Sequence, residues 1–250
     1  MKDLTYIIPV FGLKDDKVAV DNVKKAIASI GKGKKIITVG SKDDLELVKG
    51  TEKVVNDGDL SYPSQVMTAL NSVTTKYFTV IEQDDTVNEK WYDYVEEYLK
   101  TDDNEIFGYL PLTEVEDTET GEIIGYANEA FWASSFSEEL GYLDSNCMED
   151  YFNFNTSGGI FKTKEFLALG GLKTSMKLTF WYEFLLRVLY KEKKIYVIPR
   201  VGYFHKINRK GSLTDIYSST MSEKEADWWI ELAKKEFFFP QDRKKTYEEE

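Results

Sequence analysis

The stretch Tyr77–Asp85, YFTVIEQDD, decides the fold that we predict for this chain. Its first five residues, Tyr77–Ile81, are aromatic, aliphatic or β-branched and have the length of a buried strand. The last four, EQDD, place three carboxylates directly after that strand. Ligands of open α/β sheets bind at the carboxyl ends of the strands. The stretch therefore predicts a ligand-binding loop at the edge of a sheet, with a solvated acidic turn as the simpler alternative.

The chemistry of these acidic residues indicates what such a loop would hold. Carboxylates that lie close together repel one another unless a cation joins them. Mg²⁺ and Mn²⁺ prefer oxygen ligands, and they usually share them with the phosphates of a substrate. We therefore expect a divalent metal that carries a phosphate.

The sequence on either side of this stretch alternates between strand and helix patterns. Val23, Ala26, Ile27 and Ile30 follow helical spacing, for example, and Gly31 is a suitable helix end. Alternating strands and helices indicate a parallel sheet with right-handed crossovers. We expect strands at 4–11, 35–39, 53–55 and 77–81, and helices around 23–30, 43–48, 63–73 and 91–98.

The pattern is less regular after about residue 101. We expect a strand at 106–112, an acidic hairpin around 116–122, a helix at 180–190 and a strand at 195–198 that Pro199 stops. Ser222 and Glu225 form a capping box for a last helix. We predict three regions: a nucleotide-binding half at 1–100, an acceptor-binding half at 101–215, and a helix with a charged tail at 216–250.

Composition excludes several classes of protein. The formal net charge of −12 argues against non-specific binding to nucleic acid or to an anionic membrane. No apolar run approaches the roughly 18 residues that span a bilayer, and we expect neither a signal peptide nor a membrane anchor. Cys147 is the only cysteine, so an intramolecular disulfide is excluded. We expect a cytoplasmic protein.

Several motifs together resemble the GT-A glycosyltransferases, specifically family 2. No single motif is specific, but their order and spacing along residues 4–214 are those of the family. They are YIIPVFG at Tyr6–Gly12, AIASI at Ala26–Ile30, ITVGS at Ile37–Ser41, Ala69-Leu70-Asn71, VIEQDD at Val80–Asp85, Gly170-Gly171-Leu172, YEFLLRV at Tyr182–Val188 and VGYFHKINRKGSLT at Val201–Thr214.

The resemblance implies an α/β GT-A fold, with a mostly parallel central sheet flanked by helices, that binds a nucleotide sugar. Glu82-Gln83-Asp84 stands at the family's Asp-x-Asp motif, so Asp84 would ligate Mn²⁺ or Mg²⁺. Glu82 would face the ribose, or the metal through water, and Asp85 would support the site. The strand end Pro9, Val10 and Phe11 would hold the nucleobase.

The later segment would close this site. The resemblance implies that His205 completes the metal site or meets the diphosphate. Lys206, Arg209 and Lys210 concentrate positive charge beside it, as in basic loops that close over a diphosphate. A structural histidine and a solvated basic loop are the alternatives.

One departure from the family concerns the catalytic base. Alignment of Glu183 and Arg187 with the family's helix puts Phe180 and Trp181 where the family has an acidic pair, which includes the base. Three explanations stay open. A displaced carboxylate acts as base, with Glu183 and Asp150 as the candidates we favour and Glu149 beside them; the enzyme retains configuration; or transferase activity is lost.

The sequence thus predicts a metal-dependent transferase of a sugar from a nucleotide sugar, with UDP as nucleotide, to an acceptor hydroxyl. The acceptor is a saccharide or glycoconjugate, and a hydroxymethylated base in DNA is the other candidate. A catalytically inactive nucleotide-sugar or carbohydrate-binding module is the alternative function. A nucleotidyltransferase is disfavoured, because the N-terminus lacks a Gly-rich basic loop that would grip a triphosphate.

Overall fold

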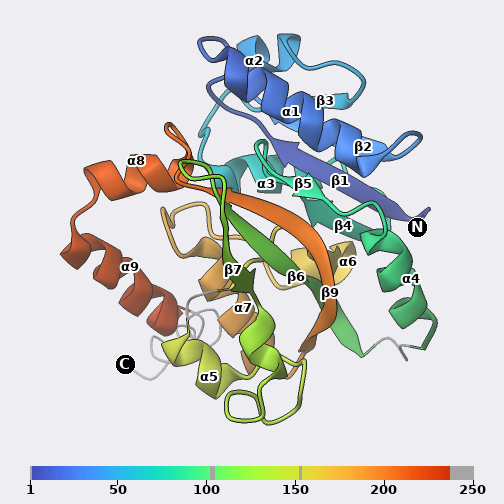
Figure 1. Cartoon of the computed structure of the whole chain (residues 1–250), viewed down its shortest axis with the longest axis vertical. Helices are drawn as coiled ribbons and strands as arrows, with labels where there is room; N and C mark the ends of the chain where they lie inside the picture. Colours follow the sequence, from blue (N-terminus) through green and yellow to red (C-terminus); the bar gives the residue numbers. More distant parts are fainter. Residues whose placement is uncertain (1, 102–104, 152–153, 237–250) are drawn as a thin grey trace, which may run out of the picture.

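The computed structural model describes residues 2–101, 105–151 and 154–236 (Figure 1). The tail that we expected at the C-terminus lies mostly outside this range. Within it, the structure leaves six side chains undescribed, those of Cys147, Glu149, Asp150, Leu213, Thr214 and Ser218.

The N-terminal half follows the predicted alternation of strands and helices. Its elements are β1 (Leu4–Pro9), α1 (Lys17–Ile30), β2 (Lys35–Gly40), α2 (Lys42–Glu46), β3 (Glu52–Val55), α3 (Tyr62–Leu70) and β4 (Tyr77–Val80). The four strands are parallel and lie side by side in the order β3-β2-β1-β4. The Asp16 carboxylate caps α1 by accepting hydrogen bonds from the amides of Val18 and Ala19.

The second half continues the same sheet. Its elements are β5 (Thr86–Val87), α4 (Trp91–Thr101), β6 (Ile106–Asp117), β7 (Ile123–Ala127), the 3₁₀ turn η1 (Glu129–Trp132), α5 (Ser145–Asp150), β8 (Ile160–Lys162), α6 (Thr163–Ala168), α7 (Phe180–Tyr190), β9 (Lys194–Ile207), α8 (Leu213–Thr220) and α9 (Glu223–Glu236). The strand order runs on from β4 through β8, β6 and β9 to β5. β8 is antiparallel to β4 and β6, whereas β6 and β9 are parallel. β7 lies off this path and pairs with β6.

One expectation about the later strands is wrong. We expected Pro199 to stop the strand that begins at Ile195, but β9 runs on to Ile207. The register against β6 shifts at this point, from Ile198 opposite Pro111 to Val201 opposite Leu112. The strand therefore bulges around Pro199, and a proline is tolerated at a bulge because the ladder needs no donor there. This continuation brings the residues after Pro199 to the site described below.

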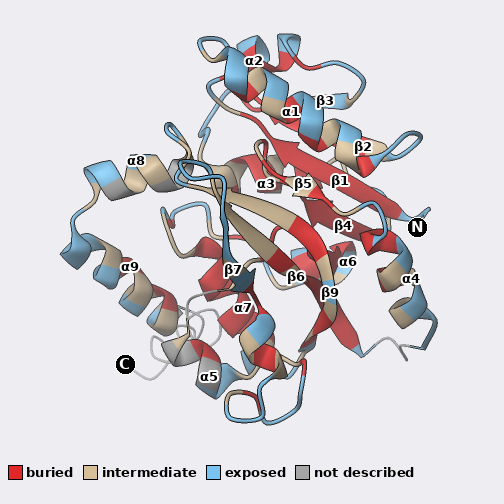
Figure 2. Ribbon diagram, in the orientation of Figure 1, coloured by how far each residue is buried: buried red, intermediate tan, exposed pale blue. Residues whose placement is uncertain are grey.

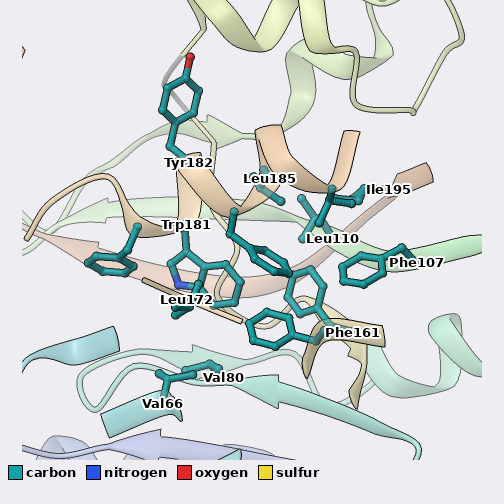
Figure 3. Packing of buried hydrophobic residues seen from close by; sticks show 14 of the residues in the cluster. Val66, Val80, Phe107, Leu110, Phe161, Leu172, Trp181, Tyr182, Leu185 and Ile195 are labelled. Atoms are coloured by element: carbon teal, nitrogen blue, oxygen red, sulfur yellow. The ribbon is translucent and has the colours of Figure 1, made fainter. Parts of the chain in front are cut away.

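Alternating residues of the parallel strands serve two separate hydrophobic cores, one on each face of the sheet (Figure 2). In β1, Tyr6 and Ile8 pack with residues of α1 and α4, whereas Ile7 packs with the cluster of α3, α6 and α7. Figure 3 shows the second cluster, in which Trp181 lies among aromatic and aliphatic side chains between α7 and the sheet. The sheet is thus covered by helices on both faces.

A close contact between β9 and α4 has no room for a side chain. A Cβ atom on Gly202 would lie 2.4 Å from Cδ2 of Trp91. The indole of Trp91 is fully buried, and its Nε1–H donates to the backbone oxygen of Gly158 at 2.8 Å. Gly202 therefore lets β9 pass closely over the first turn of α4.

Candidate functional site

A cavity of about 600 Å³ opens at the carboxyl ends of β1 and β4. Residues of the β1 end, the loop after β4, the loop before β8, the start of α7 and the end of β9 form its walls, and α8 and α9 also contribute. The position agrees with the rule that ligands of open α/β sheets bind outside the carboxyl ends of the strands. The stretch Tyr77–Asp85 thus leads into the cavity, as predicted from its sequence.

Glu82, Asp85 and His205 form a charged cluster at this cavity, which Glu82 and His205 line. One ligand atom from each of these residues lies within 4.8 Å of the others. One oxygen of the buried Asp85 carboxylate lies 2.8 Å from His205 Nδ1, and the other oxygen accepts a hydrogen bond from the Lys206 amide at 2.9 Å. The Ser157 hydroxyl donates to the Glu82 carboxylate at 2.6 Å. The two carboxylates suit Mn²⁺ or Mg²⁺, and the imidazole favours a transition metal over Mg²⁺.

Burial and mutual repulsion set the charge of this cluster. Burial raises the pKa of Glu82 to about 7, and the negative charge of Asp85 adds to the effect, while His205 opposes it. Burial lowers the pKa of His205, but the charge and hydrogen bond of Asp85 outweigh this and raise it to about 9. Without a bound metal the Asp85 carboxylate therefore favours the protonated imidazole, and His205 would have to release this proton to become a metal ligand.

Asp84 has a different partner from its two acidic neighbours. Its carboxylate accepts a hydrogen bond from Arg209 Nε. Burial and the charge of Asp85 raise the pKa of Asp84, whereas Arg209 opposes the shift. We expected Asp84 to ligate the metal and Arg209 to meet the diphosphate, and the structure pairs these two side chains with each other at the cavity wall.

The end of β1 is held at the cavity by a residue to which we assigned no role. The Gln83 side chain accepts from the Phe11 amide at 3.0 Å and donates to the Phe11 oxygen at 3.3 Å. Pro9 and Phe11 line the cavity, as expected for a nucleobase site. Val10, the third predicted residue, is fully buried in the core on the other face. The x position of the Glu-x-Asp motif thus fixes the strand end.

Glu183 does not line the cavity. Its carboxylate is fully buried and accepts from Arg187 at 3.0 and 2.9 Å, and the ammonium group of Lys173 lies 3.2 Å away. Arg187 also donates to the backbone oxygens of Leu169 and Gly171. The pair therefore braces the Gly-Gly turn before α7, and Glu183, one of the two residues predicted as catalytic base, lies buried away from the cavity. The other predicted base, Asp150, has a side chain outside the described part.

Phe180 and Trp181 form part of the cavity wall at the first turn of α7. The Phe180 ring stacks on Tyr62 with centroids 5.2 Å apart, and Trp181 stacks on Phe161 at 5.4 Å. Both side chains, which stand where the resembled family has acids, also belong to the core, and Figure 3 shows Trp181 in it. Together with Phe154, these residues make part of the cavity wall apolar.

Several residues of the site were not predicted as functional. We assigned no role to the Ser157 hydroxyl, which donates a hydrogen bond to Glu82. Tyr203 accepts a hydrogen bond from the Glu82 amide at 3.0 Å and thereby supports the same residue from β9. Both lie more than 70 residues from Glu82 in the chain. The sequence holds no local signal for such contacts.

Comparison with known proteins shows the fold. No family model and no curated protein sequence matches the chain. Crystal structures of Staphylococcus aureus TarS 1–349 are similar, at 12–13% sequence identity. The structure without a named ligand has a TM-score of 0.58, and the match covers 96% of this chain and 73% of TarS 1–349. The complexes with UDP-GlcNAc and with UDP both have a TM-score of 0.60 and cover 95% and 96% of this chain, again with 73% of TarS 1–349. The chain therefore has the GT-A glycosyltransferase fold.

Proposed function

We propose that this protein is a glycosyltransferase that takes a sugar from a nucleotide sugar, with UDP as the nucleotide. The cavity at the carboxyl edge of the sheet carries the proposal, because it combines a strand end, a carboxylate–histidine cluster and an arginine. TarS, which has the same fold, was crystallised with UDP and with UDP-GlcNAc. An unrelated chemistry on this fold would not need these groups together.

The residues of the cavity can be assigned roles in donor binding. Pro9 and Phe11 would hold the uracil ring at the end of β1. Glu82, Asp85 and His205 fit a divalent metal, Mn²⁺ or Mg²⁺, by their donor atoms and their closeness. Arg209 would exchange its contact with Asp84 for the diphosphate, and Asp84 would then join the metal ligands.

A metal in this position would supply positive charge to the diphosphate as the bond between the sugar and the leaving group breaks. Arg209 and Lys206 would also supply positive charge to the diphosphate, because both residues line the cavity. Ser157 and Tyr203 hold Glu82 in place before any ligand binds. The protein thus presents a preorganised site for the leaving group.

The acceptor would enter on the aromatic side of the cavity. We propose an acceptor hydroxyl on a saccharide or glycoconjugate, with a hydroxymethylated DNA base as the second candidate. Aromatic side chains such as Phe154 and Trp181 offer stacking surfaces to a sugar or to a base. Asp150 stays a candidate for the base that takes the acceptor's proton. Glu183 is a weaker candidate, because three hydrogen-bonding or ionic contacts already occupy its buried carboxylate.

A thermal-shift experiment tests the donor site. UDP with Mn²⁺ should raise the melting temperature of the wild-type protein, and UDP alone should raise it less. Asp84→Ala should reduce the metal-dependent part of the shift. If no nucleoside diphosphate stabilises the protein with or without Mn²⁺, the proposed function is wrong.

A catalytically inactive nucleotide-sugar-binding module is the second candidate. The observation that favours it is the aromatic pair, Phe180 and Trp181, at the position of the family's acids. Hydrolysis of UDP-sugar donors separates the two functions, since most transferases release the sugar slowly to water. Equal background turnover by the wild type and Asp84→Ala would favour the module, whereas turnover that depends on Asp84 would favour the enzyme.

A further inference from the structure

The hairpin formed by β6 and β7 has an open edge. Among the described strands, β7 pairs only with β6, through Thr113–Glu116. No other strand in the described part of the chain pairs with the second edge of β7. Unpaired backbone groups at such an edge can take up an additional strand from another polypeptide. Natural proteins usually protect an edge of this kind with charges, a bulge or a covering segment.

The side chains of β7 do not protect this edge, although a bulge at Ile124, where the register against Val115 and Glu116 shifts, interrupts its pairing with β6. Ile123 and Ile124 are each 56% exposed, and Tyr126 is 39% exposed. Three large apolar side chains within four residues are unusual on a surface where apolar residues are otherwise scattered singly. Figure 2 shows the hairpin turn and the first part of β7 as exposed. This apolar strand therefore has the features of a binding surface.

The charge of the hairpin indicates the kind of partner. The segment 113–127 contains five acidic residues and no lysine, arginine or histidine. Ion pairs among the described residues involve none of these five: Glu114, Glu116, Asp117, Glu119 and Glu122. A nucleic acid would be repelled by this charge, whereas a basic polypeptide would be attracted.

The hairpin turn is bonded directly to the wall of the cavity. The amide and the hydroxyl of Thr118 both donate to the oxygen of Ile207, at 3.2 and 2.8 Å. The Asn208 side chain donates to Asp117 at 3.0 Å. Ile207 and Asn208 line the cavity. In Figure 1 the hairpin runs beside β9 toward α8, so a strand added to β7 would lie close to the cavity mouth.

We propose that the free edge of β7 binds a cationic, extended polypeptide segment of a partner protein by addition of a strand. The segment's apolar side chains contact Ile123, Ile124 and Tyr126, and its lysines or arginines face the five carboxylates of the hairpin. Resting on the proposed glycosyltransferase function, we assign this segment to the acceptor. The acceptor is then a glycoconjugate with a polypeptide part, in preference to DNA.

The test measures binding of a fluorescent 12-residue peptide in which lysine alternates with valine. The wild-type protein should bind it, and a peptide with glutamate in place of lysine should not bind. Hydrogen exchange should show protection of the amides of Ile123–Ala127 when the lysine peptide is added. Ile123→Ser with Ile124→Ser, and separately Glu119→Lys with Glu122→Lys, should each weaken binding at least tenfold.

The matched control combines Val18→Ser with Glu46→Lys, two exposed changes on α1 and α2 that lie outside the hairpin. Equal weakening by this control, or peptide protection outside β7, would overturn the proposal. Protection of β7 that grows with protein concentration without peptide would also overturn it, because the occupant would then be a second copy. UDP shifts measured on the same variants report on the donor site independently, so failure of peptide binding leaves the proposed function testable.

Discussion

Replacement of Glu183 by glutamine separates a structural role of this residue from a catalytic one. The change keeps the size of the side chain and removes one negative charge. The carboxylate is fully buried, and it neutralises Arg187, of which the side chain is 5% exposed, together with the nearby Lys173. Removal of one partner of a buried ion pair costs about 3–5 kcal/mol, because the other charge stays buried without compensation.

We expect the free energy of unfolding to fall by about 3 kcal/mol, near the lower end of this range. Two backbone oxygens still accept hydrogen bonds from Arg187, and Lys173 is partly exposed. Urea unfolding followed by tryptophan fluorescence measures this loss. The same variant should bind UDP with unchanged affinity and should turn over the donor at the wild-type rate per folded molecule. Asp21→Asn, at an exposed pair with Lys24, is the control and should unfold at nearly the same urea concentration as the wild type.

The reasoning fails if Glu183→Gln unfolds at the same urea concentration as the wild type. It also fails if the folded variant loses more than about a hundredfold in turnover, the size of effect expected for a general base. In that case the carboxylate must reach the acceptor in a state that differs from the structure described here.

Three further predictions concern the site and the sheet. Because the raised pKa of His205, about 9, exceeds the ordinary 6.5, its pair with Asp85 should stabilise the fold fully below about pH 6.5 and lose this contribution as the pH rises through 9. The stability difference between wild type and His205→Gln, measured in urea, should therefore shrink from acidic to alkaline pH, and a constant difference would contradict this. Asp84→Ala should lower the affinity for UDP measured by calorimetry, and the loss should be larger with Mn²⁺ than without it. An equal loss under both conditions would contradict this prediction. Gly202→Ala should lower the free energy of unfolding by about 1–3 kcal/mol, because the added methyl group would overpack against Trp91. A melting temperature equal to that of the wild type would contradict this prediction.

The elements of the fold could be predicted because local patterns determine them. The strand Tyr77–Ile81 and the helix Phe180–Tyr190 correspond closely to β4 and α7. A buried strand requires a run of apolar residues, and a buried helix face requires apolar residues at helical spacing. Both patterns can be recognised in the sequence. Pro199 misled the prediction because the bulge that accommodates it depends on the register with β6, which is a long-range property.

The site was predictable only in part for the same reason. The acidic loop after β4 and the basic segment with His205 and Arg209 could be recognised, since each is contiguous in sequence. The pairing of each acidic residue with its cationic partner could not be predicted, because Asp84 and Asp85 are adjacent and either could face His205. The burial of Glu183 was likewise hidden, since an i, i+4 pair with Arg187 is typical of an exposed helix surface.

The length of β9 has a consequence for how the protein is made. His205 and Arg209 follow their carboxylate partners by 120 and 125 residues. At the usual 5–20 residues per second, a ribosome needs about 6–24 s to translate that interval. During this time the nascent β4 loop carries its acidic residues without their cations, and β6, once made, lacks its neighbour β9. We therefore expect the cavity to form late during synthesis, after β9 has inserted between β6 and β5.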